Sequence, residues 1–271
     1  MAENPTISII LPNFNGSKYL ELAIKSFVNQ DYTNKQLVIV DGKSTDGSHD
    51  IIRRYTESYP EIKWLNIFER GISEAFNNGI DVASGDIIGY LGSDDQLYSG
   101  VFKEISKAST WCAFDAIYFN SYSYFVNENR CVLRVCPDIE FTRENLLSFG
   151  TIVGWQNIFF KRHVYDKHRY DVNNRYCMDY EFYLRISIER FLYLYVDKVG
   201  TVNFFDGNIS SDPDGRQFNE ACEVAKKYAQ GYSGNLYFQR SYHLKQRLYF
   251  IARRLQKLVN RRLNSFLLKS N

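Results

Sequence analysis

The sequence has little of what marks disordered, secreted or membrane-spanning chains. Only 5 of its 271 residues are proline and 24% are charged, which is not the composition of a disordered protein. No run of about 18 apolar residues occurs, so a membrane-spanning helix is excluded. The N-terminus (MAENPTISII) has no basic stretch ahead of an apolar run, and we therefore expect no secretory signal. A folded chain with one large domain or two small ones remains.

Several sequence motifs are also missing, and each absence removes a class of site. The five cysteines are odd in number and show no CxxC or Cys/His metal spacing, which suits packed thiols in a reducing cytoplasm. The four histidines have no metal or catalytic-triad spacing, and no G-x-S-x-G is present. Neither G-x-G-x-x-G nor G-x-x-x-x-G-K-[ST] occurs, so dinucleotide and P-loop sites lack their fingerprints.

The charge is unevenly distributed along the chain. Residues 240–271 contain nine Lys and Arg and no Asp or Glu, whereas acidic residues outnumber basic ones in residues 1–239. Apolar residues of this tail share one helical face, opposite most of its basic residues, which is typical of binding to an anionic membrane surface. The alternatives are a helix packed on the body or in a homodimer, and a nucleic-acid arm. We expect no nucleic acid as a partner.

The first hundred residues alternate β-rich apolar runs with amphipathic stretches. The amphipathic stretches are 17–29, 47–58 and 72–82, which carry apolar residues at helical spacing. The apolar runs are TISIIL (6–11), LVIV (37–40), IKWLNIF (62–68) and DIIGYL (86–91). Strands that alternate with helices predict βαβ units and a parallel sheet. Ligands of such sheets bind at the carboxyl ends of the strands.

Polar and small residues follow all four predicted strands. These segments are PNFNG (12–16), DGKSTDG (41–47), ERG (69–71) and GSDD (92–95). At one strand end such a segment is ordinary turn chemistry, but its presence at all four ends favours a ligand-binding site at this edge of the sheet. Ser44, Thr45 and Asp46 are also good helix-capping residues, so we expect a structural role for Asp46.

The second half of the chain has a less regular pattern. Residues 114–135 predict a hairpin around an Asn-rich turn, and the polar stretch 206–216 marks the end of the body. A helix expected at 176–190 has Asp179 and Glu181 in its first turns. Shorter elements are expected at 141–149 (a helix) and at 157–161, 193–197 and 201–205 (strands).

Three of the strand ends carry residues that can do chemistry. Adjacent Asp94 and Asp95 repel each other unless a cation lies beside them, and Mg²⁺ is commonly held by one or two carboxylates and substrate phosphates. The alternative is a solvated turn in which Asp95 caps the next helix. Asp41 closes the second strand, where an acidic residue can accept hydrogen bonds from a ribose or a base. Arg70 and Gly71 can reach a phosphate or a base edge, or Arg70 is simply an exposed structural arginine.

Four spaced segments together resemble the large family of inverting nucleotide-sugar glycosyltransferases with the GT-A fold (glycosyltransferase family 2 type). They are SIILPNFNG, VIVDGKSTDG, GISEAFNNGIDVASGDIIGYLGSDD and MDYEFYLR, and the resemblance covers roughly residues 5–205. Bacterial members that build surface polysaccharides are the most similar. The resemblance implies an α/β, Rossmann-like, mixed and mainly parallel sheet flanked by helices. The chain departs from the family pattern at Lys43, Gly92 and Trp155-Gln156, which leaves the choice of acceptor open.

The resemblance implies a set of residues that bind the nucleotide-sugar donor. Pro12 and Asn15 match a loop that lies along the nucleoside, and Asp41 matches the residue that recognises the base, usually uracil. Arg70 and Gly71 are assigned to the same donor site. Asn77, together with Gly79 and Gly85, matches the helix-to-strand segment of the family.

The resemblance also implies the metal site and the catalytic base. Asp94 matches the carboxylate that approaches the ribose, and Asp95, with Asp94 beside it, matches the ligand of Mn²⁺ or Mg²⁺. Asp179 matches the general base that takes the proton of the acceptor hydroxyl. From the residues alone, Asp179 can equally be a first-turn charge that the helix dipole favours. For Glu181 and Arg185, a structural ion pair is the preferred interpretation.

These expectations combine into one hypothesis. A metal-dependent inverting glycosyltransferase (a hexosyltransferase-type enzyme) moves a sugar from a nucleotide diphosphate sugar, UDP-linked in our prediction, to a hydroxyl of a glycan or lipid-linked glycan. It acts peripherally at the cytoplasmic face of a bacterial cell membrane, in surface polysaccharide synthesis. The domains expected are a catalytic domain (1–205, with donor half 1–96 and acceptor half 97–205), a linker with a helix (206–239) and the basic tail (240–271).

Two other functions remain as alternatives. A sugar-1-phosphate nucleotidyltransferase also uses an α/β nucleotide domain and Mg²⁺, but it usually needs a Gly-rich basic loop after the first strand, which PNFNG is not. A non-catalytic sugar- or nucleotide-binding module of the same fold need not keep Asp94, Asp95 and Asp179 together.

Overall fold

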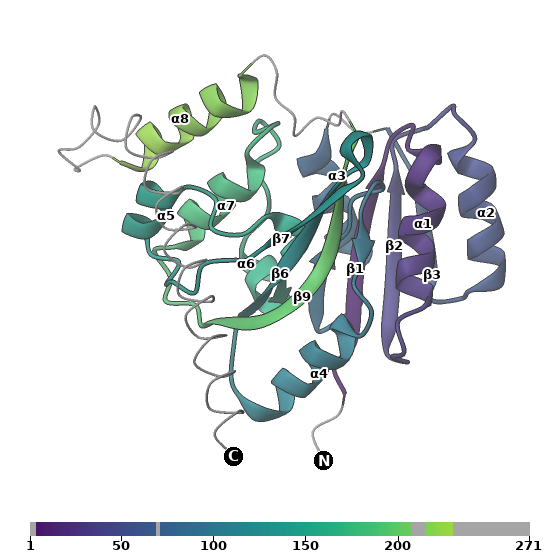
Figure 1. Cartoon of the computed structure of the whole chain (residues 1–271), viewed down its shortest axis with the longest axis horizontal. Helices are drawn as coiled ribbons and strands as arrows, with labels where there is room; N and C mark the ends of the chain where they lie inside the picture. The colour runs from purple at the N-terminus through teal and green to yellow at the C-terminus, as the bar shows by residue number, and fades with distance from the viewer. Residues whose placement is uncertain (1–3, 69–70, 207–214, 230–271) are drawn as a thin grey trace.

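A computed structural model describes residues 4–68, 71–206 and 215–229 (Figure 1). In these residues, nine strands form one sheet in the order β3-β2-β1-β4-β8-β6-β9-β5, with β7 paired to β6. The strands are β1 (Ile7–Asn13), β2 (Lys35–Asp41), β3 (Ile62–Asn66), β4 (Ile87–Tyr90), β5 (Gln96–Leu97), β6 (Ala116–Phe125), β7 (Arg130–Arg134), β8 (Ile158–Lys161) and β9 (Tyr193–Phe205). The α-helices are α1 (Ser17–Val28), α2 (Ser48–Ser58), α3 (Ile72–Val82), α4 (Val101–Trp111), α5 (Arg143–Phe149), α6 (Arg162–Lys167), α7 (Met178–Ile186) and α8 (Arg216–Tyr228).

The first four strands form the predicted parallel sheet. β1 pairs in parallel with β2 on one side and with β4 on the other, and β2 pairs in parallel with β3. The apolar residues of β1 and β2 are fully buried because helices cover both faces, as in parallel sheets generally. β3 ends at Asn66, short of the apolar run that predicted it, and Phe68 is 77% exposed.

The second half turns the sheet into a mixed one. β8 runs antiparallel to β4, β6 runs antiparallel to β8, and β9 runs parallel to β6. The predicted hairpin is confirmed as β6 and β7. The two strands expected at 193–197 and 201–205 are one strand, because register shifts around Asn120 let β9 continue alongside β6. The helix expected at 176–190 is confirmed but shorter, since α7 ends at Ile186.

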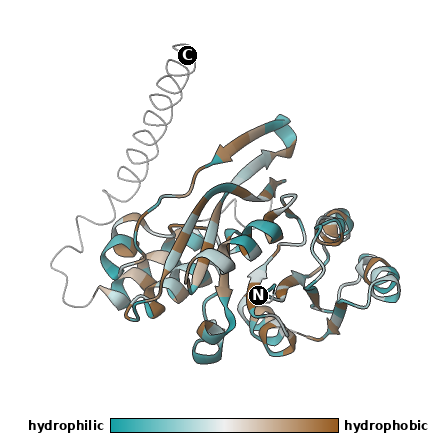
Figure 2. Cartoon of the chain, turned by 90° about the horizontal axis from the view of Figure 1, so that it is seen from below, coloured by the Kyte–Doolittle hydropathy of each residue, from teal (hydrophilic) through white to brown (hydrophobic). Residues whose placement is uncertain are grey.

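Helices cover the sheet on both faces, which confirms the predicted α/β architecture (Figure 1). One buried apolar cluster joins the sheet to α1, α2 and α4, and the other joins it to α3, α5, α6, α7 and α8. The outlying helices in Figure 2 alternate between hydrophobic and hydrophilic residues, as helices with one face on a core do. Among the described residues, no helix has the length and apolarity needed to cross a membrane.

Two glycines explain how closely α3 and β4 approach the central strand. A side chain at Gly79 would collide with Ile10 of β1, and a Cβ at Gly85 would lie 2.6 Å from the backbone nitrogen of Ser8. Glycine is therefore required here by close packing rather than by contact with a ligand. This packing sets how far α3 and the segment before β4 lie from β1.

Candidate active site

The carboxyl ends of β1 and β2 are joined by a buried cluster centred on Asp41. One carboxylate oxygen of Asp41 accepts hydrogen bonds from Asn13 Nδ2 (2.7 Å) and Ser44 Oγ (2.7 Å). The other accepts from the Ser44 backbone N–H (2.9 Å) and lies 2.9 Å from His49 Nε2. Burial alone would raise the pKa of Asp41, but these hydrogen bonds hold it below its ordinary value. Asp41 is therefore ionised, and its carboxylate holds the side chains of Asn13, Ser44 and His49 in place.

The loop after β1 is tied to the loop after β2 through Asn15. Its backbone has a left-handed conformation (φ 53°), its N–H donates to Ser44 Oγ (2.8 Å), and its side-chain oxygen accepts from Thr45 N–H (2.8 Å). Pro12 lies inside β1, opposite Val40 of β2. These contacts give the loop a fixed shape next to Asp41.

Asp46 has the structural role that its sequence position predicts. Its carboxylate accepts hydrogen bonds from the N–H of Ser17 (2.8 Å) and from the N–H (3.1 Å) and Oγ (2.6 Å) of Ser48. Ser17 and Ser48 are the first residues of α1 and α2, so one carboxylate holds both helix N-termini. Asp46 thereby fixes the two loops on either side of Asp41 to the starts of α1 and α2.

The two carboxylates after β4 are turned toward a common point. A Cβ placed on Gly92 would lie 2.8 Å from Asp94 Oδ1 and 2.9 Å from Asp95 Oδ2. Asp95 is buried, and its other oxygen accepts a hydrogen bond from the Phe204 N–H at the end of β9 (3.0 Å). Burial and the adjacent charge of Asp94 raise the pKa of Asp95 well above its ordinary value.

This donor set fits a divalent cation that shares its ligands with a substrate. One oxygen of each carboxylate lies beside Gly92, and a cation bound by the two would offset the repulsion between them. The described residues contain no group of three or more His, Cys, Asp or Glu side chains arranged to hold a metal ion. The pair therefore suits Mg²⁺ or Mn²⁺ completed by phosphate oxygens and water, and not an all-protein metal cage.

Asp179 lies in the first turn of α7. Its Oδ1 accepts a hydrogen bond from the Tyr180 N–H (2.8 Å), and the backbone N–H of Trp155 also works to lower the pKa of the carboxyl. The residue as a whole is half-buried, yet desolvation of the carboxyl raises its pKa to about 6 despite these hydrogen bonds. Burial thus outweighs the helix N-terminus, which would favour the ionised form.

Hydrogen bonds join α8 to α7, the helix that carries Asp179, and to the segment before it. Glu181 is buried and bonds to Arg185 Nε (3.0 Å) and to the hydroxyl of Tyr228 (2.6 Å), so the predicted structural ion pair is confirmed. The carboxylate of Glu220 in α8 accepts hydrogen bonds from the backbone N–H groups of Arg175 (2.7 Å) and Tyr176 (3.0 Å). α8 therefore fixes the segment that leads into Asp179.

Two of the predicted donor-binding residues need comment. The Asn77 side chain donates to the Tyr170 carbonyl (2.9 Å) and accepts from the Tyr170 N–H (2.9 Å). Its amide thus joins α3 to the segment before α7, and its role in donor binding stays a prediction. Gly71 is exposed at the start of α3, and Arg70 lies outside the described residues.

Sequence reasoning missed two aromatic residues beside this site. Phe14, in the loop after β1, is 70% exposed, and Phe68, after β3, is 77% exposed. The Phe14 ring lies against Gly42, where an added Cβ would be 3.2 Å from the ring. Exposed rings at strand ends offer flat apolar surfaces for a planar ligand. A phenylalanine inside the otherwise polar segment PNFNG was the available signal.

Comparison with known proteins assigns the family. The family model for glycosyl transferase family 2 matches residues 8–169, which is more than half of the chain. The chain belongs to glycosyl transferase family 2.

Relatives of known sequence include a Campylobacter jejuni GalNAc(5)-diNAcBac-PP-undecaprenol β-1,3-glucosyltransferase, 33% identical over 38% of this chain and 34% of that protein. Glycosyltransferase GlyA of Streptococcus pneumoniae is 25% identical over 64% of this chain and 27% of that protein. The matched part thus spans about a third or less of the length of these curated relatives.

Solved structures share the fold of this chain. Residues 1–349 of Staphylococcus aureus TarS, in complex with UDP-GlcNAc, match 82% of this chain and cover 66% of that one, with a TM-score of 0.65 at 17% identity. The mannosyltransferase PcManGT of Pyrobaculum calidifontis, in complex with GDP-Man and Mn²⁺, matches 90% of this chain and 70% of that one, with a TM-score of 0.64 at 18% identity. The predicted GT-A fold is confirmed.

Proposed function

We propose that this chain is a metal-dependent inverting glycosyltransferase that uses a nucleotide diphosphate sugar. The observation that carries the proposal is Asp179, a carboxylate whose pKa is raised to about 6 by desolvation. Such a group is ionised at neutral pH but more basic than an ordinary carboxylate, which is what a general base needs. Family membership and the fold shared with proteins in complex with UDP-GlcNAc or GDP-Man support a nucleotide-sugar donor.

The donor side of the proposed site uses the ends of the parallel strands. The nucleoside lies along the Pro12–Asn15 loop, with its base against the exposed ring of Phe14 and beside the Asp41 cluster. Because each Asp41 oxygen already accepts two hydrogen bonds, a direct contact with the base requires one of these partners to be exchanged. Asp94 lies next to the ribose, and Asp95 with Asp94 holds Mn²⁺ or Mg²⁺. That cation, when bound, neutralises negative charge on the diphosphate.

The acceptor side uses Asp179. Its carboxylate takes the proton of the acceptor hydroxyl while that oxygen forms a bond to the anomeric carbon, and the bond from this carbon to the diphosphate oxygen breaks. A single displacement from the opposite face inverts the configuration. The hydrogen bond from the Tyr180 N–H orients the carboxylate for this proton transfer.

The two alternatives are weaker on structural grounds. In the loop after β1, the Asn15 N–H donates to Ser44 Oγ, and the neighbouring Gly42 N–H donates to the Asn13 carbonyl. These amides are not open to a phosphate, as a nucleotidyltransferase loop would need. A non-catalytic module has no reason to keep a desolvated carboxylate at the start of α7, where it costs stability.

The biological setting rests on the sequence and on the relatives. We propose a glycan or lipid-linked glycan acceptor in bacterial surface polysaccharide synthesis at the cytoplasmic face of the membrane. The name of the Campylobacter jejuni relative includes PP-undecaprenol, which is in keeping with a lipid-linked acceptor. Attachment to an anionic membrane through residues 240–271, and a possible homodimer, stay predictions, since this tail lies outside the described residues.

Binding of the donor tests the proposal first. Thermal unfolding of the full chain is measured with UDP, GDP and CDP and with their sugars, each with Mn²⁺ and with EDTA. A Mn²⁺-dependent rise in Tm with one nucleotide is expected, because a ligand that binds only the folded state stabilises it. Absence of any shift across the whole panel would contradict a donor site of this kind.

A further inference from the structure

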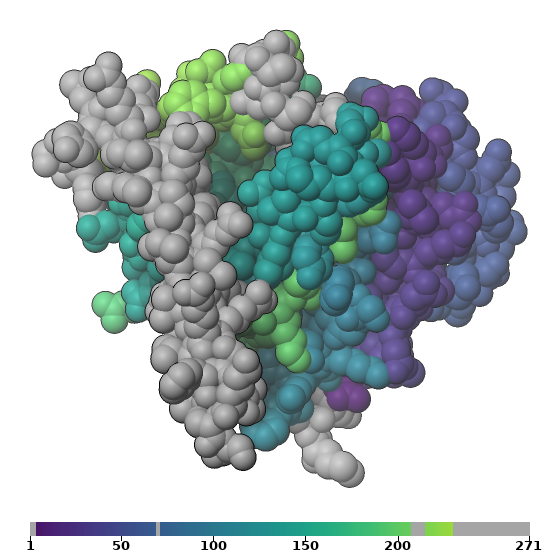
Figure 3. All heavy atoms as spheres, viewed as in Figure 1, coloured from purple at the N-terminus to yellow at the C-terminus, as the bar shows by residue number. Residues whose placement is uncertain are grey.

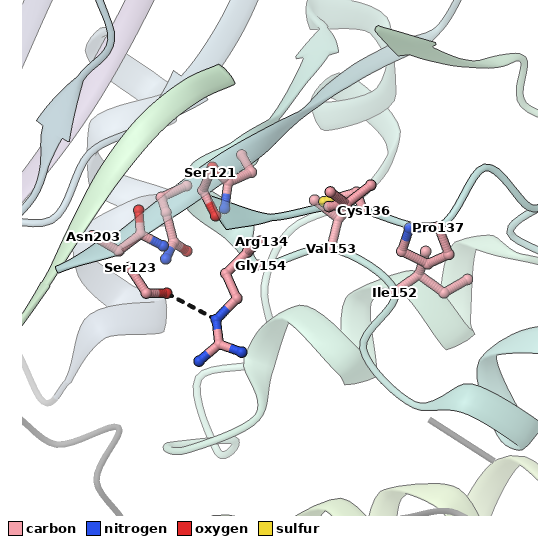
Figure 4. A pocket seen from close by; sticks show the side chains of 12 residues that line it. Ser121, Ser123, Arg134, Cys136, Pro137, Ile152, Val153, Gly154 and Asn203 are labelled. Carbon is pink, nitrogen blue, oxygen red and sulfur yellow. Dashed lines mark hydrogen bonds between the residues drawn. The ribbon is translucent and has the colours of Figure 1, made fainter. Parts of the chain in front are cut away.

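A cavity of about 190 Å³ opens beside the β6–β7 hairpin (Figure 4). It is bounded by the hairpin, by the end of β9 and by the segment 152–157. Apolar residues of segments 135–137 and 152–153 line much of it, and its polar and charged lining residues are Ser121, Ser123, Arg134, Gln156, Asn157 and Asn203. In Figure 3 the teal atoms of the hairpin lie on the surface between α8 and the purple α1. We propose that this cavity binds a negatively charged sugar unit of the acceptor and that Arg134 selects it. The inference rests on the proposed function.

The polar lining is built into the sheet. In the parallel register of β6 and β9, Ser121 stands opposite Thr201 and Ser123 opposite Asn203, so all four share one face. All four are buried, and the Thr201 hydroxyl bonds to Asn203 Oδ1 (2.8 Å) and also to Asn157. Buried polar side chains are costly unless hydrogen-bonded, and a cavity lined with them suits a hydroxyl-rich ligand.

Gln156 lines the cavity and carries an unsatisfied polar atom. Its side-chain oxygen is buried and has no hydrogen-bond partner among the described residues. A buried polar atom without a partner is unusual in a folded protein. A sugar hydroxyl in the cavity reaches this oxygen only when the Gln156 side chain turns toward it.

Arg134 supplies a positive charge at the mouth. Its Nε donates to Ser123 Oγ (3.2 Å), and its guanidinium lies 6.0 Å from the Phe125 ring. In Figure 4 the terminal nitrogens point away from Ser123. No carboxylate in the described part of the chain lies within 4.0 Å of Arg134, whereas Arg130 on the same strand pairs with Glu128 at 2.7 Å. A guanidinium without a protein counter-ion is well suited to a phosphate or carboxylate.

The cavity shares its walls with both proposed catalytic carboxylates. Gly154 and Gln156 line it, and the backbone N–H of Trp155 between them lowers the pKa of Asp179. Asn203 lines it as well, and the next residue, Phe204, donates its N–H to Asp95. A ligand in the cavity therefore touches the segments that hold the proposed base and the proposed metal ligand, which is where an acceptor unit belongs.

The size and chemistry of the cavity define the ligand. A volume of about 190 Å³ is smaller than the roughly 300–1,000 Å³ of typical ligand pockets, so it suits one small unit of a larger ligand. The unit must offer an anionic group to Arg134 and hydroxyl groups to the serine and asparagine side chains of the lining. Two sources share this chemistry, a uronic acid and a sugar phosphate.

The test titrates the full chain with glucose, glucuronic acid and glucose 6-phosphate by ligand-observed NMR, with and without UDP and Mn²⁺. Either anionic sugar is expected to bind at least about tenfold more tightly than glucose, and Arg134→Ala to remove that advantage, because a charge-assisted hydrogen bond is lost. The better anion identifies the source: glucuronic acid indicates a carboxylate, and glucose 6-phosphate a phosphate. Arg130→Ala is the matched control and should bind like the wild type.

Equal binding of all three sugars, or an Arg134→Ala variant that keeps the preference for anions, would overturn the inference. Arg134 is exposed, so folding of the variant should be unaffected, and the charge reversal Arg134→Glu provides a second test that should abolish anion binding. UDP binding with Mn²⁺ is measured in a separate titration. If the wild-type chain does not bind UDP in the presence of Mn²⁺, the proposed function is wrong. If it binds UDP but shows no preference for anionic sugars, only the proposal for this cavity is wrong.

Discussion

Asn in place of Asp179 should make the protein more stable while it removes transfer. Desolvation raises the pKa of this carboxyl from its ordinary 3.8 to about 6, so the folded state binds the proton more tightly than the unfolded state. The stability that this group contributes is therefore fully present below pH 3.8 and is lost as the pH rises through about 6. A shift of about two units, at about 1.36 kcal/mol per unit, corresponds to a cost of up to about 3 kcal/mol at pH 7.5.

The neutral amide of Asp179→Asn avoids that cost. We expect the free energy of unfolding to rise by about 1–3 kcal/mol at pH 7.5, the smaller figure allowing for the half-exposed position and for a weaker hydrogen bond from the Tyr180 N–H. The advantage over the wild type should shrink by about 2 kcal/mol between pH 7 and pH 4. Donor binding should be unchanged, and transfer should fall by about 10²–10⁴-fold.

Urea denaturation of the wild type and of Asp179→Asn across this pH range measures the effect. Asp166→Asn is the matched control, because Asp166 is an exposed helical aspartate for which no comparable change is expected. If Asp179→Asn instead lowers stability, or if the difference between the two proteins does not vary with pH, the carboxylate is a solvated first-turn charge that the helix dipole favours. The reasoning for a desolvated base would then be wrong.

Three further predictions follow from the site. Because Asp179 must be ionised to accept a proton, log(kcat/KM) should fall with a slope of about one below pH 6 and be flat above pH 7; a profile with no inflection between pH 5 and 7 contradicts this assignment. Asp95→Ala should abolish the Mn²⁺-dependent rise in Tm with the nucleotide, with the EDTA series as control, and an unchanged affinity in Mn²⁺ would count against Asp95 as the metal ligand. Glu220→Ala removes two hydrogen bonds to the segment before Asp179, each contributing about 1 kcal/mol, and should lower kcat with little change in donor affinity. The control Glu223→Ala, on the exposed side of α8, should leave kcat unchanged. Equal kcat values for the two variants would refute the positioning role of Glu220.

The parallel half of the fold could be predicted because its signals are local. Each buried strand is an apolar run with a polar segment at its end, so the place of Asp41 and of Asp94 and Asp95 at one sheet edge follows from topology alone. The same reasoning predicted the structural role of Asp46, since helix-capping chemistry is also local.

The rest depends on contacts between segments far apart in the chain. Asn77 bonds to Tyr170, 93 residues away, and no local pattern indicates this tertiary contact. The desolvation that gives Asp179 its raised pKa likewise comes from other segments that pack around the carboxyl. The union of two predicted strands into β9 depends on register with β6, which no pattern within residues 193–205 encodes.

The configuration of the first product tests the central claim most directly. The chain is incubated with Mn²⁺ and the nucleotide sugar that gives the largest rise in Tm, and the anomeric proton of the released or transferred sugar is followed by NMR. Water serves as the acceptor where no glycan is supplied. Metal-dependent consumption of an α-linked donor with a β-configured first product is the predicted result. A first product that retains the α-configuration, or a donor that is not consumed, would contradict a metal-dependent inverting transferase with Asp179 as its base.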